Sequence, residues 1–199
     1  MSKIEFYYDF GSPKCYLVHK TLPKLAKKYS KKLFWKPILL GGVFKLTNNQ
    51  SPIKAFNSVK GKLEYDLMET KRFISRHKIN YKMNPYFPVM TMAVMRGALY
   101  SQDKEWEFLY RDTVFDAIWV HEKKMDDPET INKVLADAKL PATEILMATQ
   151  DNAIKSQLIN WTNEAVSRGI FGAPTAFIGK EMFFGKECIF EIEDYLKNA

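Results

Sequence analysis

The first thirty residues show two spacings of apolar side chains, one typical of a strand and one of a helix. Ile4, Phe6 and Tyr8 occupy every second position, as a half-buried strand requires. From Pro13 to about Tyr29 the apolar residues recur every three or four positions, which predicts a helix. Pro13 suits the first helical position because an N–H there would have no partner. The opening therefore predicts a strand that runs into a helix.

A second strand is predicted soon after this helix. Two apolar runs, Leu33-Phe34-Trp35 and Ile38-Leu39-Leu40, provide its side chains. Pro37 interrupts or ends the strand because it has no N–H to donate, and Gly41-Gly42 closes it. Together the three segments predict a β-α-β unit.

The middle of the chain is predicted to be almost entirely helical. Residues 48–58 are polar and indicate a loop, and the prolines of residues 84–88 indicate a turn between two helices. The predicted helices cover residues 62–77, 92–100 and 105–120, a helix capped by Asp127-Pro128, a short helix that begins at Pro141, and residues 151–168.

Strands return near the C-terminus. Gly169 ends the preceding helix, and residues 175–178 and 182–184 flank Gly179-Lys180 as in a hairpin. A last helix is predicted at residues 187–196. The chain thus has a β-α-β half and a β-β-α half with helices between them.

Two short motifs indicate what these halves form. Ser12-Pro13-Lys14-Cys15 has the C-x-x-C spacing of a redox motif, with serine in the first position, and Gly172-Ala173-Pro174-Thr175 precedes an apolar run. This pair predicts a thioredoxin-type site. The predicted fold class is therefore α/β, a thioredoxin-like fold with a large helical insertion. Residues 1–50 and 170–199 form the thioredoxin-like domain, and residues 51–169 form the inserted helical domain.

Ser12 admits a structural and a functional interpretation. As the helix N-cap, its hydroxyl accepts a hydrogen bond from the first turn. A helix N-terminus also favours an anion, and a hydroxyl there can donate to the thiolate of a ligand such as glutathione. The bond before Pro174 is predicted to be cis, which would turn the backbone of residue 173 toward a bound peptide. The alternative is a trans proline that starts a strand. A ligand is expected in a cleft between the Ser12 loop and the helical block.

A different chemistry would need a base or a reactive thiol beside Ser12. His19, His77 and His121 are each better explained as surface or packing residues than as a base for Ser12. Cys15 occupies the second, inner position of the motif, where a cysteine more often packs than reacts. A thiol–disulfide oxidoreductase that uses Cys15 remains an alternative.

Composition narrows the class of protein. The 199 residues are 46% hydrophobic, which suits a globular protein that needs neither disulfides nor a metal. We expect a cytoplasmic protein without a membrane partner, because no apolar run reaches about 18 residues and the two cysteines lie far apart. The net charge of +7 comes from lysines spread along the chain without interleaved aromatic residues, so no nucleic acid is expected as a partner.

Four motifs, spread over nearly the whole chain, carry a family resemblance. They are Tyr8-Asp9-Phe10-Gly11-Ser12-Pro13; Lys62 to Arg72, which resembles K-x-x-Y-x-x-x-D/E-x-x-R; Phe87-Pro88-Val89-Met90-Thr91 with Met95-Arg96-Gly97-Ala98; and residues 169–175 with Met182-Phe183-Phe184-Gly185. In these motifs the chain resembles the kappa-class glutathione transferases and the 2-hydroxychromene-2-carboxylate isomerases, relatives of the DsbA-type oxidoreductases.

The resemblance implies glutathione as cofactor and assigns its contacts. Ser12 would hold the glutathione sulfur, Ala173 and Pro174 would pair with its cysteinyl part, and Lys62 would contact the ligand. Glu187 would meet the γ-glutamyl ammonium. Lys186, which stands where the family has a hydroxyl or amide, is also expected among the glutathione-binding residues. Taken alone, Lys62 would be a solvated helix charge and Glu187 an acid in a first helical turn.

Other residues of the motifs leave alternatives open. Met90 replaces a usual asparagine and Cys188 a usual arginine of the family. Arg96 is interpreted as a structural ion pair with Asp9 or Glu69 rather than as a substrate contact. Phe115 and Trp119 line either the acceptor pocket or the core.

The implied activity is a glutathione-dependent isomerase with Ser12 as the catalytic residue. A kappa-class transferase that conjugates electrophiles would use the same residue, and a glutathione-binding protein without catalysis is a third possibility. The resemblance also implies a homodimer and a small electrophilic or aromatic substrate.

Overall fold

A computed structural model describes residues 3–198. Its elements, in chain order, are β1 (Lys3–Tyr8), α1 (Pro13–Lys28), β2 (Lys32–Pro37), α2 (Leu40–Leu46), α3 (Pro52–Phe56), α4 (Lys62–His77), α5 (Met92–Tyr100), α6 (Glu107–Trp119), α7 (Pro128–Asp137), α8 (Ala142–Ala148), α9 (Asn152–Ser167), β3 (Thr175–Ile178), β4 (Glu181–Phe184) and α10 (Cys188–Asn198). Most of the predicted helices and strands are confirmed within two or three residues.

The strands form one mixed sheet in the order β2-β1-β3-β4. β1 and β2 are parallel, and Ile4 pairs with Leu33. β1 and β3 are antiparallel, and the same Ile4 pairs with Ile178 on its other side. β1 is therefore a central strand, which joins the N-terminal β-α-β half to the C-terminal β-β-α half.

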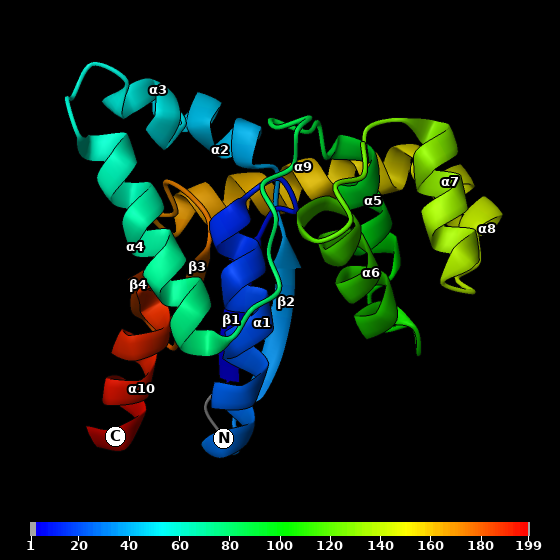
Figure 1. Ribbon diagram of the computed structural model, residues 1–199. Helices are drawn as coiled ribbons and strands as arrows, with labels where there is room; N and C mark the ends of the chain where they lie inside the picture. Colours follow the sequence, from blue (N-terminus) through cyan, green and yellow to red (C-terminus); the bar gives the residue numbers. More distant parts are fainter. Residues whose placement is uncertain (1–2, 199) are drawn as a thin grey trace.

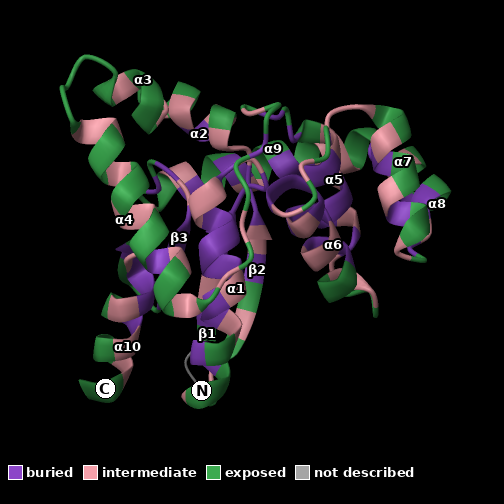
Figure 2. Cartoon of the chain, viewed as in Figure 1, coloured by how far each residue is buried: buried purple, intermediate pink, exposed green. Residues whose placement is uncertain are grey.

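Both faces of the sheet are covered by helices (Figure 1). Ile4, Phe6 and Tyr8 of β1 point into the main core with α1, whereas Tyr7 points to a second cluster with Ala165 of α9. The alternation seen in the sequence thus places β1 between two apolar layers. In Figure 2 most of α1, β1 and β3 is buried, whereas α3 and α4 are exposed over much of their length.

The helical segment and the sheet share one core. Phe115 of α6 packs edge-to-face against Phe10 with ring centroids 4.7 Å apart, and it also contacts Tyr8 of β1. Phe115 and Trp119 are fully buried in this core, which settles their role as packing residues rather than pocket lining. The division into a domain of residues 1–50 and 170–199 and a domain of residues 51–169 stays a prediction.

Of the sequence predictions about the segment after β2, one is confirmed and one is wrong. β2 ends at Pro37, one of the two outcomes predicted for this proline, although the N–H of Ile38 still donates to the Tyr8 carbonyl of β1. The N–H of Leu39 donates to the Thr162 hydroxyl and that of Leu40 to the Asp9 carboxylate, so the chain leaves the sheet there. Gly41-Gly42 is not a closing turn but lies inside α2.

The predicted loop at residues 48–58 contains the short helix α3. Ser51 is its N-cap and accepts a hydrogen bond from the N–H of Lys54, and Pro52 follows at the first position. This is the same Ser-Pro start signal that marks α1. Within residues 3–198 no helix combines the length and the apolar character needed to cross a bilayer.

Candidate functional site

Ser12 lies where β1 ends and α1 begins. Its hydroxyl accepts a hydrogen bond from the N–H of Cys15 at 3.2 Å, which is the predicted N-cap, and donates to the carbonyl of Ala173 at 3.2 Å. The residue is 5% exposed. One hydroxyl thus links the start of α1 to the loop before β3, although the two are separated by 161 positions in sequence.

The loop before β3 has the predicted geometry. The Ala173-Pro174 peptide bond is cis. The Pro174 carbonyl accepts a hydrogen bond from the N–H of Gly185 at 3.0 Å, just before Lys186 and Glu187. The structure therefore brings three of the predicted segments together, namely the Ser12 turn, Ala173-Pro174 and the loop at residues 185–187.

Hydrogen-bond donors remain free at this junction. α1 begins with proline and its N-cap uses the N–H of Cys15, so the N–H of Lys14 lacks a protein acceptor among the described residues. The N–H of Ala173 is equally free within residues 3–198. Since a helix N-terminus also carries a partial positive charge, the junction favours an anionic or hydrogen-bond-accepting group.

The buried carboxylate of Asp9 stabilises the Ser12 turn. This carboxylate accepts hydrogen bonds from the Thr91 hydroxyl at 2.5 Å, the N–H of Gly11 at 2.9 Å and the N–H of Leu40 at 2.9 Å. Burial raises the pKa of Asp9, and the hydrogen bonds act in the opposite direction. Trp119 adds a further support by donating to the Phe10 carbonyl at 2.8 Å.

The predicted pairing of Arg96 with Asp9 or Glu69 is wrong. Arg96 donates instead to the Thr149 carbonyl at 3.4 Å and to the sulfur of Met92 at 3.1 Å. Asp9 has neutral donors as partners, so it needs no arginine.

Lys186 and Glu187 form a charged group with Glu69 of α4. The Lys186 side chain is fully buried, and its ammonium donates to Glu69 Oε2 at 2.6 Å and to the Glu187 carboxylate. Burial alone would raise the pKa of Glu187, but the hydrogen bond and the charge of Lys186 hold it below its usual range. Sequence reasoning missed the partnership with Glu69, although this residue fills the acidic position of the Lys62–Arg72 motif.

Lys62, at the start of α4, is not in hydrogen-bond contact with this junction in the described structure. Its ammonium pairs with Asp66 one turn later at 2.7 Å and lies 5.4 Å from the centre of the Phe56 ring. A ligand contact from Lys62 stays a prediction that requires its side chain to leave Asp66.

The two cysteines are buried and unbonded. Burial raises the pKa of Cys15 to about 12, and burial likewise raises the pKa of Cys188. A thiol in this state is protonated at neutral pH, and its sulfur is not accessible to a disulfide. The structure therefore weighs against an oxidoreductase that uses Cys15.

No histidine in the described part of the chain contacts Ser12. His19 is buried in the core, where its Nε2 bonds to Asp112 at 2.9 Å and its ring stacks on Phe115. Burial lowers the pKa of His19, and Asp112 acts in the opposite direction. His77 packs against Phe73, and His121 is exposed. Ser12 consequently lacks a base and is better suited to donating a hydrogen bond than to attacking.

An apolar surface borders the junction. Phe171 and Phe184 lie with ring centroids 4.5 Å apart and are about 40% exposed, on either side of the cis-proline loop. A Cβ atom on Gly172 would lie 3.0 Å from the Phe184 ring, so glycine permits this approach. Met90, which follows the second cis proline at Pro88, is exposed as well.

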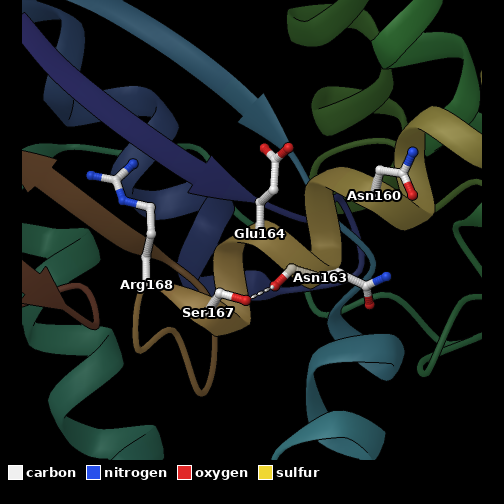
Figure 3. Close-up of a pocket in the computed structure, with 5 residues that line it drawn as sticks. All are labelled: Asn160, Asn163, Glu164, Ser167 and Arg168. Carbon is white, nitrogen blue, oxygen red and sulfur yellow. Dashed lines mark hydrogen bonds between the residues drawn. The ribbon is translucent and has the colours of Figure 1, made fainter.

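Two depressions on the described part of the chain do not contain the predicted site residues. One of about 610 Å³ lies along α9, and Figure 3 shows its polar lining, which includes Glu164 and Arg168. Another of about 400 Å³ lies beside α1 at Tyr16 and Lys20. The cleft expected between the Ser12 loop and the helical block stays a prediction. Within residues 3–198 no cluster of three or more His, Cys, Asp or Glu residues could hold a metal ion.

Comparison with known proteins places the chain in a family. The model of the DSBA-like thioredoxin domain matches residues 3–197. The chain belongs to this family. It is 29% identical to a 2-hydroxychromene-2-carboxylate isomerase of Pseudomonas putida over 194 residues, which is 96% of this chain and 92% of the relative. It is 24% identical to rat glutathione S-transferase kappa 1, covering 92% and 86%.

A solved structure gives the same result. A 2-hydroxychromene-2-carboxylate isomerase superposes with a TM-score of 0.85 at 26% identity, covering 98% of this chain and 94% of that one. The predicted thioredoxin-like fold and the resemblance to the isomerase and kappa-class proteins are confirmed.

Proposed function

We propose that the protein is a glutathione-dependent isomerase of the 2-hydroxychromene-2-carboxylate type, with Ser12 as the catalytic residue. The observation that carries this proposal is the position of the Ser12 hydroxyl, at the start of α1 and beside the carbonyl of Ala173. The isomerases among the relatives support the reaction class, and the kappa-class relative supports glutathione.

The residues at the junction fit glutathione. A thiolate would receive hydrogen bonds from the Ser12 hydroxyl and the free N–H of Lys14. The free N–H of Ala173 suits an extended peptide laid beside the cis-proline loop. The half-exposed carboxylate of Glu187 is the acidic group that a γ-glutamyl ammonium would meet, and Lys62 is a further proposed contact.

Ser12 acts by stabilising charge. When bound, glutathione supplies a thiolate that adds to an electrophilic carbon and later leaves it, so the tripeptide is not consumed. The Ser12 hydroxyl must turn its proton from the Ala173 carbonyl toward the sulfur. Lowering the pKa of a bound thiol by two units requires about 2.7 kcal/mol of preferential interaction, which two directed donors can supply.

The same residues would serve a transferase, in which the sulfur stays attached to the product. Among the protein's residues, only those that contact the electrophilic substrate would differ between the two functions. The exposed rings of Phe171 and Phe184 suit an aromatic substrate. A protein that binds glutathione without turnover would share the binding residues.

The test is turnover of 2-hydroxychromene-2-carboxylate, a cyclic hemiketal, with and without glutathione, measured by NMR and mass spectrometry. We expect the trans unsaturated 2-oxo acid to form only when glutathione is present, with the glutathione concentration unchanged. A stable glutathione adduct would indicate a transferase, and binding without product would indicate a non-catalytic protein. Conversion that is independent of glutathione would contradict the proposal.

A further inference from the structure

The buried lysine at position 186 is the least expected charge in the molecule. Its side chain is 0% exposed, and the ring of Phe73 lies 5.9 Å from its ammonium. Burying a charge costs several kcal/mol unless it is paired. The hydrogen bonds to Glu69 and Glu187 provide the pairing. Moving the ammonium out of this position would therefore leave both carboxylates without their cationic partner.

The conformation of the loop fixes Glu187 toward this lysine. Gly185 has a φ of +78°, and a Cβ atom there would lie 2.8 Å from Glu187 Oε2. The Glu187 carboxylate therefore folds back over Gly185 toward its neighbour Lys186. Because the N–H of Gly185 also bonds to the Pro174 carbonyl, this arrangement is tied to the loop beside Ser12.

The charges do not cancel. One ammonium faces two carboxylates, and only the carboxylates reach the surface, with 34% of the Glu69 side chain and 47% of the Glu187 side chain exposed. Lys186 offsets half of the charge of the two carboxylates, and a ligand cation that arrives there must share oxygens that already accept hydrogen bonds from Lys186.

We propose that Lys186 is a specificity-determining residue that replaces the cationic group of the ligand, so that the site accepts thiol peptides whether or not they carry a free amino group. This inference rests on the proposed function, and it widens the ligand class from glutathione to its des-amino counterpart. Lys186 itself does not contact the ligand but positions Glu187 and partly neutralises it.

The test compares two ligands that differ only in the amino group, glutathione and glutaryl-cysteinyl-glycine, by calorimetry at neutral pH and low salt. For the natural protein we expect dissociation constants within about threefold of each other. For Lys186→Met we expect glutathione to bind at least about tenfold more tightly than its des-amino analogue, because both carboxylates then face the ligand alone.

Two variants control for side effects. Lys186→Arg keeps the charge and is expected to keep the ratio of the natural protein. Lys180→Met removes an exposed lysine of the nearby hairpin turn and is expected to change nothing. If Lys186→Met does not fold, the ratio of the two dissociation constants measured on the natural protein still tests the proposal.

The outcomes separate this inference from the function on which it rests. A natural protein that prefers glutathione by about tenfold or more, or a Lys186→Met ratio equal to that of the natural protein, would overturn the role of Lys186 alone. Binding of neither ligand would overturn the proposed function as well.

Discussion

At the scale of single residues, the Ser12 turn depends on the buried carboxylate of Asp9. Asp9 orders the chain from residue 9 to residue 12, and its partners come from both the sheet side and the helical segment. Thr91 is the one side-chain donor among them. The turn that presents Ser12 is therefore positioned partly by residues far away in sequence.

Thr91→Val tests this support. The variant keeps the shape of the side chain but removes a hydrogen bond to a buried charged group, so we expect a loss of about 1.5–3 kcal/mol in the free energy of unfolding, measured with urea. Thr143→Val is the matched control and should be nearly neutral, because Thr143 is exposed on α8 and its side chain makes no hydrogen bond within residues 3–198. Equal effects of the two substitutions would contradict the role assigned to Asp9.

His19 predicts a pH dependence of stability. Because burial lowers its pKa in the folded state, the unfolded chain binds a proton more readily as the pH falls below the ordinary value of about 6.5. Stability from this residue is thus fully present above that pH and is lost as the pH falls toward the folded pKa. Urea unfolding between about pH 7.5 and pH 5 should show this loss.

His19→Phe should reduce this slope, since phenylalanine can still pack on Phe115 and does not titrate. His121→Gln changes an exposed histidine and should leave the slope as it is. A slope that is the same in all three proteins would rule out His19 as its source.

At the scale of elements, the contact of α5 with α6 depends on one glycine. A Cβ atom on Gly97 would lie 2.1 Å from the hydroxyl oxygen of Tyr110, which donates to the Val94 carbonyl. Gly97→Ala should therefore destabilise the protein by about 1–3 kcal/mol, even though alanine favours a helix. Gly41→Ala on α2 has open space around it and should be neutral or stabilising by up to about 1 kcal/mol. Thermal unfolding of both variants tests this prediction. A Gly97→Ala variant that is more stable than the natural protein would contradict the close contact between Gly97 and Tyr110.

The elements also show where sequence reasoning was sufficient. α4 was predicted with its observed bounds because local spacing defines its start and end. α2 was missed because the side chains that accept the N–H groups at its start, Thr162 and Asp9, are far away in sequence. Gly41-Gly42 resembled a turn, but the hydrogen bond from the N–H of Leu40 to Asp9 fixes the start of a helix that includes both glycines. α3 had a usable signal in Ser51-Pro52 that was overlooked.

At the scale of the whole molecule, the site could be predicted only in part. Ser12 and Ala173-Pro174 meet as expected, because the order of strands in this fold brings the ends of β1 and the loop before β3 together. The pairing of Lys186 with Glu69 could not be predicted from spacing, since 117 positions separate them. Burial of a lysine is a property of the assembled core, and the sequence shows only a charged residue in a loop.

The family resemblance also predicts that two copies of the chain associate. Light scattering should return twice the mass of one chain at micromolar concentration. A mass of one chain that does not change with concentration would refute the homodimer. The proposals for Ser12 and Lys186 use residues of a single chain and do not depend on this result.

The central claim is that Ser12 stabilises a thiolate brought by the ligand, and titration of the bound thiol tests it most directly. Ultraviolet absorbance of the thiolate would be followed against pH for saturating glutathione with the natural protein, Ser12→Ala and Ser51→Ala. Ser51 is the N-cap of α3, so its loss controls for the removal of a capping hydroxyl. We expect the pKa of the bound thiol to lie well below its ordinary value of about 8.5–9 in the natural protein and Ser51→Ala, and to rise toward that value in Ser12→Ala. An unshifted thiol in the natural protein, or the same low pKa in Ser12→Ala, would contradict the account.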